Sequence, residues 1–408
     1  MKVSVKNLAQ IHNAENIEIK DFNIFIGKNG TGKTYFAKLI YFLNNFSYKM
    51  LLAEKFLGKK IKESFENKAD VIITIKEQEA FIQEFNNQIK NRYPEFISSK
   101  KEIFSKFTFS TSIDDLNGTT VKYDETIDSL KEYTSAIAIR FILNTFQIAE
   151  THYLPAARAN YMITYKHLFE SEFNNFREVL LNKKRKKKIS ILPEVENNFL
   201  RDIYQVNTKI HGELFSLGSK IEKTIFKSGK LSIRNPQHQD LPTYEYRLND
   251  IKQNIDLVSA SSAITELSPL IMYLRHKISH VSSEMLIIDE PELSLHPDAQ
   301  AKLVEVMVEA VNKGLKIIMV THSPYIIEAL NNHLQRNKIK NYKMSKNIQD
   351  FEAISANQVS AYLFEDSTIK NILDDEMKLI DDKLLNSFNK LNDIYDEMRD
   401  IEWDNQGD

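Results

Sequence analysis

The chain has 408 residues, and its 54 Lys and Arg against 56 Asp and Glu give a formal net charge of −2 at pH 7. This length can bury a large core, and a content of 42% hydrophobic and 27% charged residues is ordinary for a globular protein. The absence of cysteine excludes a disulfide framework and any cysteine-ligated zinc site, and it fits a reducing cytoplasm. Because the net charge is close to zero, any contact with nucleic acid must come from local basic patches.

The first residues alternate as a β-strand does and lack a signal-peptide pattern. We predict that residues 2–8 and 17–26 pair as strands of an N-terminal lobe. No apolar stretch of the sequence reaches membrane-spanning length. We therefore expect a soluble, cytoplasmic protein with no membrane partner.

Residues 27–34 read G-K-N-G-T-G-K-T and satisfy the pattern G-x-x-x-x-G-K-[ST] in full. They follow the apolar run 22–26, a predicted buried strand, and precede a predicted helix at 35–43. Strand, glycine-rich turn and helix is the context of a phosphate-binding loop, and the alternative is a chance glycine turn. Backbone N–H groups and the helix N-terminus would then converge on phosphate oxygens. The residues predicted to bind nucleotide are Gly27, Lys28, Asn29, Gly30, Thr31, Gly32, Lys33, Thr34 and Tyr35.

The stretch from 46 to 149 is rich in Lys, Glu, Phe and Asn, and we interpret it as an α/β insertion. We predict a strand at 71–75, a helix at 77–89, a hairpin of strands 106–112 and 119–123, and a helix at 130–147. Residues 160–225 are predicted to be mostly helical, and 230–234 and 244–248 to be short strands returning to the main domain.

Six consecutive cations run from Lys183 to Lys188. One interpretation is a solvated loop between helices. The other is a contact with the phosphate backbone of DNA or RNA, which would be strongly salt-dependent. The sequence leaves both open.

Residues 285–290 form an apolar strand that ends in two carboxylates, Asp289 and Glu290. Asp289 suits a water-mediated hold on Mg²⁺ together with the Thr34 hydroxyl, while Lys33 would reach the β- and γ-phosphates. Glu290, one residue on, suits polarising the water that attacks the γ-phosphate. These residues predict Mg-ATP as the ligand.

A second apolar strand at 316–320 ends in Thr321, His322 and Ser323. A histidine at a strand end beside phosphates can sense or stabilise charge on the γ-phosphate. The alternative is a structural histidine. The preceding phosphate loop and carboxylate pair favour a functional role for His322.

The C-terminal segment has apolar residues at three- and four-residue steps between Met377 and Ile401, which predicts an amphipathic helix. That helix either packs on its own domain or docks on a partner or second protomer. Asp374, Asp375 and Glu376 are interpreted as a solvated acidic face rather than a metal site.

The runs D-E-P-E-L-S-L-H-P at 289–297 and T-H-S-P at 321–324 resemble the ABC-type ATPase heads of the SMC/RecF group. More closely, the chain is similar to bacterial stand-alone, AAA-labelled, OLD-like ATPases. The resemblance covers roughly residues 1–45, 150–170 and 225–345. It implies an α/β P-loop NTPase head with a mixed or parallel core sheet, an antiparallel N-terminal lobe and a largely helical insertion. It also implies ATP hydrolysis, with Lys33, Glu290 and His322 as catalytic residues and Asp289 and Thr34 on Mg²⁺.

The same resemblance assigns two further stretches. Residues 261–267 lie where such heads keep their signature motif, so Ser261 and Ser262 would contact the γ-phosphate bound to a second protomer. The family usually has glycine where this chain has Ala263, and an ordinary serine-capped helix start is the alternative. Residues 153–158 resemble the Y-L-P-A-x-R strand end near the Q-loop. Arg158 would contact phosphate or relay its state, and Gln147 is a weaker Q-loop candidate.

The resemblance divides the chain into five segments. They are 1–45 (head with phosphate loop), 46–149 (insertion), 150–225 (Q-loop strand and helical lid), 226–345 (head with signature, carboxylates and switch histidine) and 346–408 (acidic helical segment). No strand ending in Glu-Gly follows residue 340, which indicates that the Toprim nuclease domain of OLD proteins is lacking.

The expected function is an ATPase that assembles as a nucleotide-sandwiched homodimer or higher oligomer and controls a partner effector. The ATPases of the Septu, PARIS and retron anti-phage systems are the nearest resemblance, and they pair with an HNH or Toprim nuclease. A RecF-type DNA-repair ATPase and a low-turnover, ATP-bound regulatory scaffold are the alternatives. A stand-alone nuclease is disfavoured because no nuclease motif is present.

Overall fold

The structure is a computed structural model. It describes residues 1–44, 46–97, 106–113, 116–123, 126–127, 129–146, 148, 150–181, 192–234, 241–250, 253–339, 352–374 and 379. The basic run 183–188, Gln147 and almost all of the predicted C-terminal helix lie outside the described residues. No described helix is long and apolar enough to cross a membrane.

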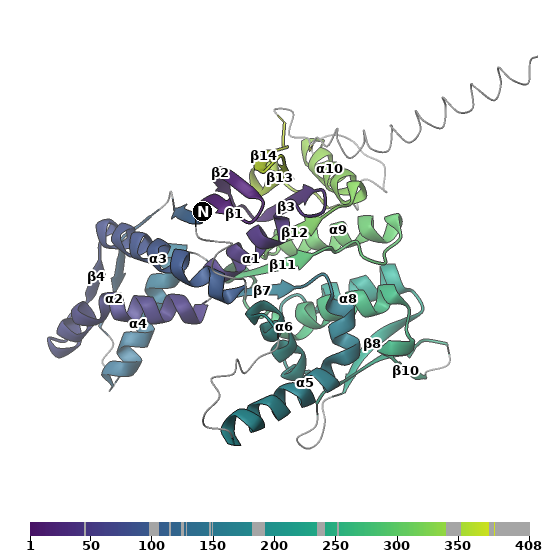
Figure 1. Ribbon diagram of the computed structural model, residues 1–408, viewed down its shortest axis with the longest axis horizontal. Coiled ribbons are helices and arrows are strands. Elements are labelled where there is room, and N and C mark those ends of the chain that lie inside the picture. The colour runs from purple at the N-terminus through teal and green to yellow at the C-terminus, as the bar shows by residue number, and fades with distance from the viewer. Residues whose placement is uncertain are drawn as a thin grey trace, which may run out of the picture.

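A nine-stranded mixed sheet forms the centre of the molecule (Figure 1). Its spatial order is β5 (Thr108–Ser112), β1 (Lys2–Leu8), β2 (Ile11–Glu18), β14 (Thr368–Asn371), β13 (Val359–Glu365), β3 (Phe22–Gly27), β12 (Lys316–Thr321), β11 (Glu284–Asp289) and β7 (Glu150–Leu154). The five strands from β13 to β7 are parallel, whereas β5, β1 and β2 pair antiparallel. The expected α/β class with a parallel core and an antiparallel N-terminal lobe is confirmed.

Helices cover both faces of the parallel half, which is why β3 and β11 are buried at every residue. Alternate side chains of one strand enter different cores, so Ile24 belongs to one apolar cluster and Phe25 to the other. The helices α9 (Pro297–Asn312) and α10 (Pro324–Lys338) supply the first cluster. Helix α1 (Lys33–Leu43) supplies the second.

The insertion packs three helices against a two-stranded sheet. The helices are α2 (Phe46–Glu66), α3 (Ile75–Phe96) and α4 (Leu130–Phe146), and the strands are β4 (Val71–Ile73) and β6 (Thr119–Val121). The predicted strand at 71–75 is too long because Thr74 caps α3: Thr74 N donates to Glu77 Oε2 over 2.8 Å, and Glu77 N donates to Thr74 Oγ1 over 3.3 Å. The predicted hairpin is wrong, since β5 pairs with β1 and β6 pairs with β4.

A second lobe follows β7, and Figure 1 shows it below the sheet. It contains α5 (Arg158–Leu181), α6 (Glu194–Tyr204), α7 (Phe215–Ile221), a sheet of β8 (Gly229–Arg234), β9 (Thr243–Leu248) and β10 (Asn254–Asp256), and α8 (Ser262–Met272). Helices α7 and α8 each continue into a π-helical turn, η2 (Glu222–Phe226) and η4 (Tyr273–Lys277). Short 3-10 turns lie at Leu257–Ser259, Val281–Ser283 and Ala356–Gln358.

Two further sequence predictions need correction. The strand predicted at 17–26 is interrupted after Glu18, because the Asn23 side chain closes a turn by accepting from Lys20 N and donating to Lys20 O. The boundary drawn at residue 346 is wrong for the described part of the segment 346–408. There β13 joins the central sheet beside β3, and β14 returns antiparallel to it, so this part is strand with one 3-10 turn rather than the predicted acidic helix.

Candidate functional site

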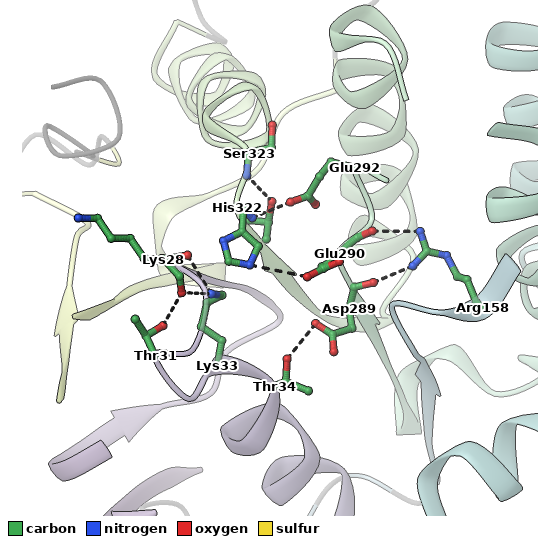
Figure 2. A network of polar contacts seen from close by, with 12 residues as sticks. Lys28, Thr31, Lys33, Thr34, Arg158, Asp289, Glu290, Glu292, His322 and Ser323 are labelled. Atoms are coloured by element: carbon green, nitrogen blue, oxygen red, sulfur yellow. Dashed lines mark hydrogen bonds and ion pairs between the residues drawn. The ribbon is translucent and has the colours of Figure 1, made fainter. Parts of the chain in front are cut away.

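Most of the residues predicted to handle nucleotide, but not Arg158, Ser261 and Ser262, meet at the carboxyl ends of three adjacent parallel strands, β3, β12 and β11 (Figure 2). Each strand end carries one group: the glycine-rich loop follows β3, His322 follows β12, and Asp289 ends β11. Parallel strands place their carboxyl ends at one edge of the sheet, which is the usual ligand edge of such folds.

The glycine-rich loop depends on glycine at defined positions. Gly27, Gly30 and Gly32 have φ angles of 147°, 75° and 97°, a region that side chains with a Cβ rarely adopt. A Cβ on Gly27 would also lie 2.4 Å from the Phe364 carbonyl oxygen of β13. The loop backbone is therefore free to curl into a cradle of N–H groups at the start of α1.

Lys33 lies inside this loop. Its Nζ donates to the carbonyl oxygens of Gly27 and Lys28 over 2.8 and 2.7 Å. Burial lowers the pKa of Lys33 to about 8, partly offset by the carboxylates of Asp289, Glu290 and Glu292. The ammonium is therefore placed at the loop and is near the acids of β11.

Thr34 and Asp289 face each other although 254 residues separate them in the chain. The Thr34 hydroxyl donates to Asp289 Oδ1 over 3.4 Å, and the Tyr153 hydroxyl donates to Asp289 Oδ2 over 2.9 Å. Burial raises the pKa of Asp289 to about 6, and the charge of Glu290 adds to this rise, while the two hydroxyls act against it. One hydroxyl and one carboxylate beside a phosphate loop fit Mg²⁺, which takes few protein ligands and completes its shell with phosphate and water. In the described residues no larger cluster of His, Cys, Asp and Glu could hold a metal ion.

Glu290 and His322 point toward one another, with 3.7 Å between Glu290 Oε1 and His322 Nε2. Glu290 has a φ of 49°, a left-handed backbone that is uncommon outside glycine, and its N–H donates to the Val320 carbonyl over 2.8 Å. This tight turn aims the carboxylate back toward the loop. Burial and the nearby Lys33 cation lower the pKa of His322, while Glu290 and Glu292 act against this, and the net shift favours the neutral imidazole.

Arg158 does not reach the phosphate loop. It is 1% exposed, and its Nη1 and Nη2 donate to the backbone carbonyls of Asp289 and Glu290 over 2.7 and 3.1 Å. Its Nε donates to the Glu266 carbonyl of α8 over 3.0 Å and lies 3.3 Å from the Glu266 carboxylate. The prediction that Arg158 contacts phosphate is therefore not supported by this structure. The residue instead joins α8 to the two acids.

Ser261 and Ser262 begin α8 and are exposed. Ser261 is the N-cap residue, but its side chain makes no capping hydrogen bond. The predicted alternative of an ordinary serine-capped helix start is therefore not observed. The two hydroxyls and the first N–H groups of α8 form a polar helix end that faces solvent.

The remaining predicted residues surround the loop. Lys28 and Asn29 are exposed, and Figure 2 shows the Lys28 side chain extending away from Lys33. The Thr31 hydroxyl donates to the Lys28 carbonyl over 2.9 Å, which closes the loop on itself. Tyr35 is 37% exposed at the first turn of α1.

Sequence reasoning missed the roles of Tyr153 and Glu292. Tyr153 holds Asp289 Oδ2, and Glu292 Oε1 accepts from the His322 N–H over 2.6 Å. Tyr153 lies in register with Ile287 on the neighbouring strand, so the parallel pairing of β7 with β11 was the missing information.

Comparison with known proteins identifies one family. The model of the family described as AAA ATPase domain matches residues 1–327. No curated protein matches the chain. Similar solved structures include one described as "Crystal structure of the SmcHead bound to the C-winged helix domain of ScpA", with 12% identity, 91% of this chain and 96% of that chain covered, and a TM-score of 0.39. Another is "SMC head domain from Thermotoga maritima", with 11% identity, coverage of 91% and 97%, and a TM-score of 0.33. These TM-scores are too low for either likeness to support an argument.

Proposed function

This chain belongs to the AAA ATPase domain family, and from that premise we propose that it binds ATP with Mg²⁺ and hydrolyses it. The contact between Thr34 and Asp289 carries the proposal. It joins the glycine-rich loop near the start of the chain to the twin acids of β11, as a triphosphate site requires.

Each group at the site has a role that its position supports. Lys33 supplies positive charge to the β- and γ-phosphates, and Thr34 and Asp289 would hold Mg²⁺, which neutralises phosphate charge when bound. Glu290 orients and polarises the attacking water, and the neutral His322 beside it donates a hydrogen bond to the γ-phosphate. Catalysis in this scheme is positioning and electrostatics.

Two substitutions test this assignment. Lys33→Ala removes the loop cation, so Mg²⁺-dependent ATP affinity should be lost in equilibrium binding. Glu290→Gln keeps the shape of the site but removes the base, so ATP binding should persist while phosphate release falls by about 10²-fold or more. The exposed Lys313→Ala and Glu328→Gln are matched controls and should behave as the wild type. Unchanged ATP affinity in Lys33→Ala would contradict the proposal.

We further propose that ATP closes a homodimer in which Ser261 and Ser262 of one protomer contact the nucleotide on its partner. The exposed, uncapped start of α8 supports this, since it offers free donors to an anion outside its own chain. The mass of the Glu290→Gln protein, measured by light scattering with and without Mg-ATP, should double on ATP addition. A mass that does not respond to ATP would count against the dimer.

Control of a partner nuclease in anti-phage defence is the last part of the proposal, and the family resemblance of the sequence supports it. The protein should then co-purify with the product of a neighbouring reading frame that carries an HNH or Toprim nuclease. Nuclease activity of that complex should differ between ATP-bound and nucleotide-free states. DNA-stimulated ATP hydrolysis that falls when Lys183 to Lys188 are neutralised would instead favour the DNA-repair alternative.

A further inference from the structure

A cavity of about 680 Å³ lies in the second lobe, and its lining contains none of the residues of the nucleotide site. It is formed where the π-helical ends of α7 and α8 meet the strand β8. Its size is within the usual range of small-molecule sites. Both π-helical turns, η2 and η4, contribute to the wall, and such turns are frequent at functional sites.

The charge of the lining is strongly positive. Lys223, Lys227, Lys230 and Arg275 line the cavity together with a single carboxylate, Glu222. Glu222 is already engaged: one oxygen pairs with Arg275, and the other accepts from the Leu231 N–H over 2.6 Å. The three lysines are exposed and form no ion pair with the described residues, so their positive charge remains available to an anion.

Arg275 is fixed in the wall rather than free on the surface. It is 8% exposed, and its Nη2 donates to Ser219 over 3.2 Å and to Glu222. A Cβ on Gly218 would lie 2.8 Å from Arg275 Cγ, so glycine allows α7 to pack against this side chain. The Nε atom is buried and has no hydrogen-bond partner in the described part of the chain. Glu222 and Ser219 therefore hold the guanidinium in the wall, and the positive charge left for a ligand is that of the three lysines.

Two aromatic rings complete the lining. Phe215 and His276 both line the cavity, and their ring centroids lie 5.7 Å apart. The Arg275 guanidinium lies over the Phe215 ring at 5.4 Å. Half-buried aromatic rings beside cations suit a ligand that carries both a flat ring and phosphate.

Lys227, at the rim of the cavity, ends the π-helical turn η2. Lys227 has a φ of 60°, a conformation uncommon for residues other than glycine, and its N–H donates to the Glu222 carbonyl over 2.9 Å. A residue with positive φ is a common way to end a helix.

We propose that this cavity is a second nucleotide site, separate from the phosphate loop. It would take phosphate on Lys223, Lys227 and Lys230, and a base against Phe215 and His276.

The stoichiometry of nucleotide binding tests the site. Wild-type protein and Lys33→Ala are titrated with AMP, ATP, ribose 5-phosphate and inorganic pyrophosphate in equilibrium dialysis. The expected result is two moles of ATP per chain for the wild type and one for Lys33→Ala. One mole for the wild type and none for Lys33→Ala would overturn the second site but leave the phosphate loop intact. One mole of ATP per chain for both proteins would support the second site and show that the phosphate loop does not bind ATP.

Charge substitutions then locate the second mole. In the Lys33→Ala protein, Lys223→Gln with Lys230→Gln should weaken nucleotide binding at least about tenfold, because two charge-assisted contacts are lost. Lys59→Gln with Lys62→Gln on α2 is the matched control, since those lysines are 92% and 63% exposed, and it should leave binding unchanged. Unchanged nucleotide binding in the variant with Lys223→Gln and Lys230→Gln would overturn the second site. Pyrophosphate binding as tightly as a nucleotide would overturn the assignment of a base to Phe215 and His276.

Discussion

Lys49 is a charged residue in a wholly buried position. It is 0% exposed, and its Nζ donates to Asn44 Oδ1 over 3.1 Å and to the Ile148 carbonyl over 3.4 Å. The same nitrogen lies 4.5 Å from the Phe146 ring centroid. No described carboxylate pairs with Lys49, and burial lowers its pKa to about 7. The folded state therefore disfavours the charged lysine.

Replacing Lys49 by methionine should stabilise the protein in a pH-dependent way. Above the unfolded pKa, near 10.5, the amine is neutral in both states and costs little. As pH falls toward 7 the unfolded state takes up the proton first, so the penalty grows, and it is constant below about pH 7. Lys49→Met should thus gain up to about 4 kcal/mol at pH 7 and much less above pH 10.

Urea unfolding at pH 7 and pH 10.5 measures this difference. Lys55→Met on the same helix is the control, because Lys55 is exposed and its replacement should change stability equally little at both pH values. A gain from Lys49→Met of the same size at both pH values would show that packing, and not charge, explains the effect.

At the scale of elements, the contact between β3 and β13 fixes the phosphate loop. The two strands are parallel, and Gly27 lies opposite Phe364 in their register. Gly27→Ala places a methyl group against the Phe364 carbonyl and strains the backbone, so it should destabilise the protein by about 2 kcal/mol or more.

Gly58→Ala is the matched control for Gly27→Ala. Gly58 lies within α2, and a Cβ there meets no atom within 4 Å. That substitution should stabilise the protein by up to about 1 kcal/mol, since alanine favours a helix interior over glycine. Thermal unfolding of both variants checks the contrast, and equal shifts in the same direction would refute the strand-contact argument.

Arg158 connects α8 to the acids of β11. We predict that Arg158→Lys lowers kcat by about tenfold, because a lysine cannot hold two carbonyls and Glu266 at once. The Kd for ATP should change little, since Arg158 makes no hydrogen bond with the glycine-rich loop.

Comparing the change in hydrolysis rate with the change in ATP affinity shows whether Arg158 positions other groups or contacts phosphate directly. Single-turnover hydrolysis and equilibrium ATP binding are measured on the same Arg158→Lys protein, with the exposed Arg201→Lys as control. If ATP affinity falls as much as the rate, Arg158 acts on the nucleotide itself and the link through α8 is wrong.

These elements also show what the sequence could predict. The loop at 27–34, Asp289, Glu290 and His322 were accessible because each lies in a short motif at the end of an apolar strand. The pairing of β13 with β3 could not be predicted from the sequence, since it joins residues more than 300 positions apart and no local pattern encodes it. For the same reason β5 and β6 looked like one hairpin.

At the scale of the whole molecule, the site is assembled from distant parts of the chain. Four strands of the parallel half-sheet each contribute one part of the site. The loop follows β3, Tyr153 and Arg158 lie on or after β7, the acids end β11, and His322 follows β12. The start of α8 is the part that stays exposed. A nucleotide-sandwiched dimer would complete each site with that helix end from the partner.

Mixing two inactive variants tests whether the sites are shared between protomers. Lys33→Ala disables the loop, and Ser262→Arg blocks the start of α8, so each homodimer should be inactive. In a random mixture half of the dimers are mixed, and each mixed dimer contains one site in which both parts are intact. Hydrolysis should therefore recover to at most about a quarter of the wild-type rate, since Lys33→Ala also weakens ATP-driven closure. Lys33→Ala mixed with Glu290→Gln is the control. Both of its defects lie on the loop side of the site, so neither site of the mixed dimer is complete and no recovery is expected. Recovery in the control, or none in the first mixture, would show that the nucleotide does not bridge two protomers.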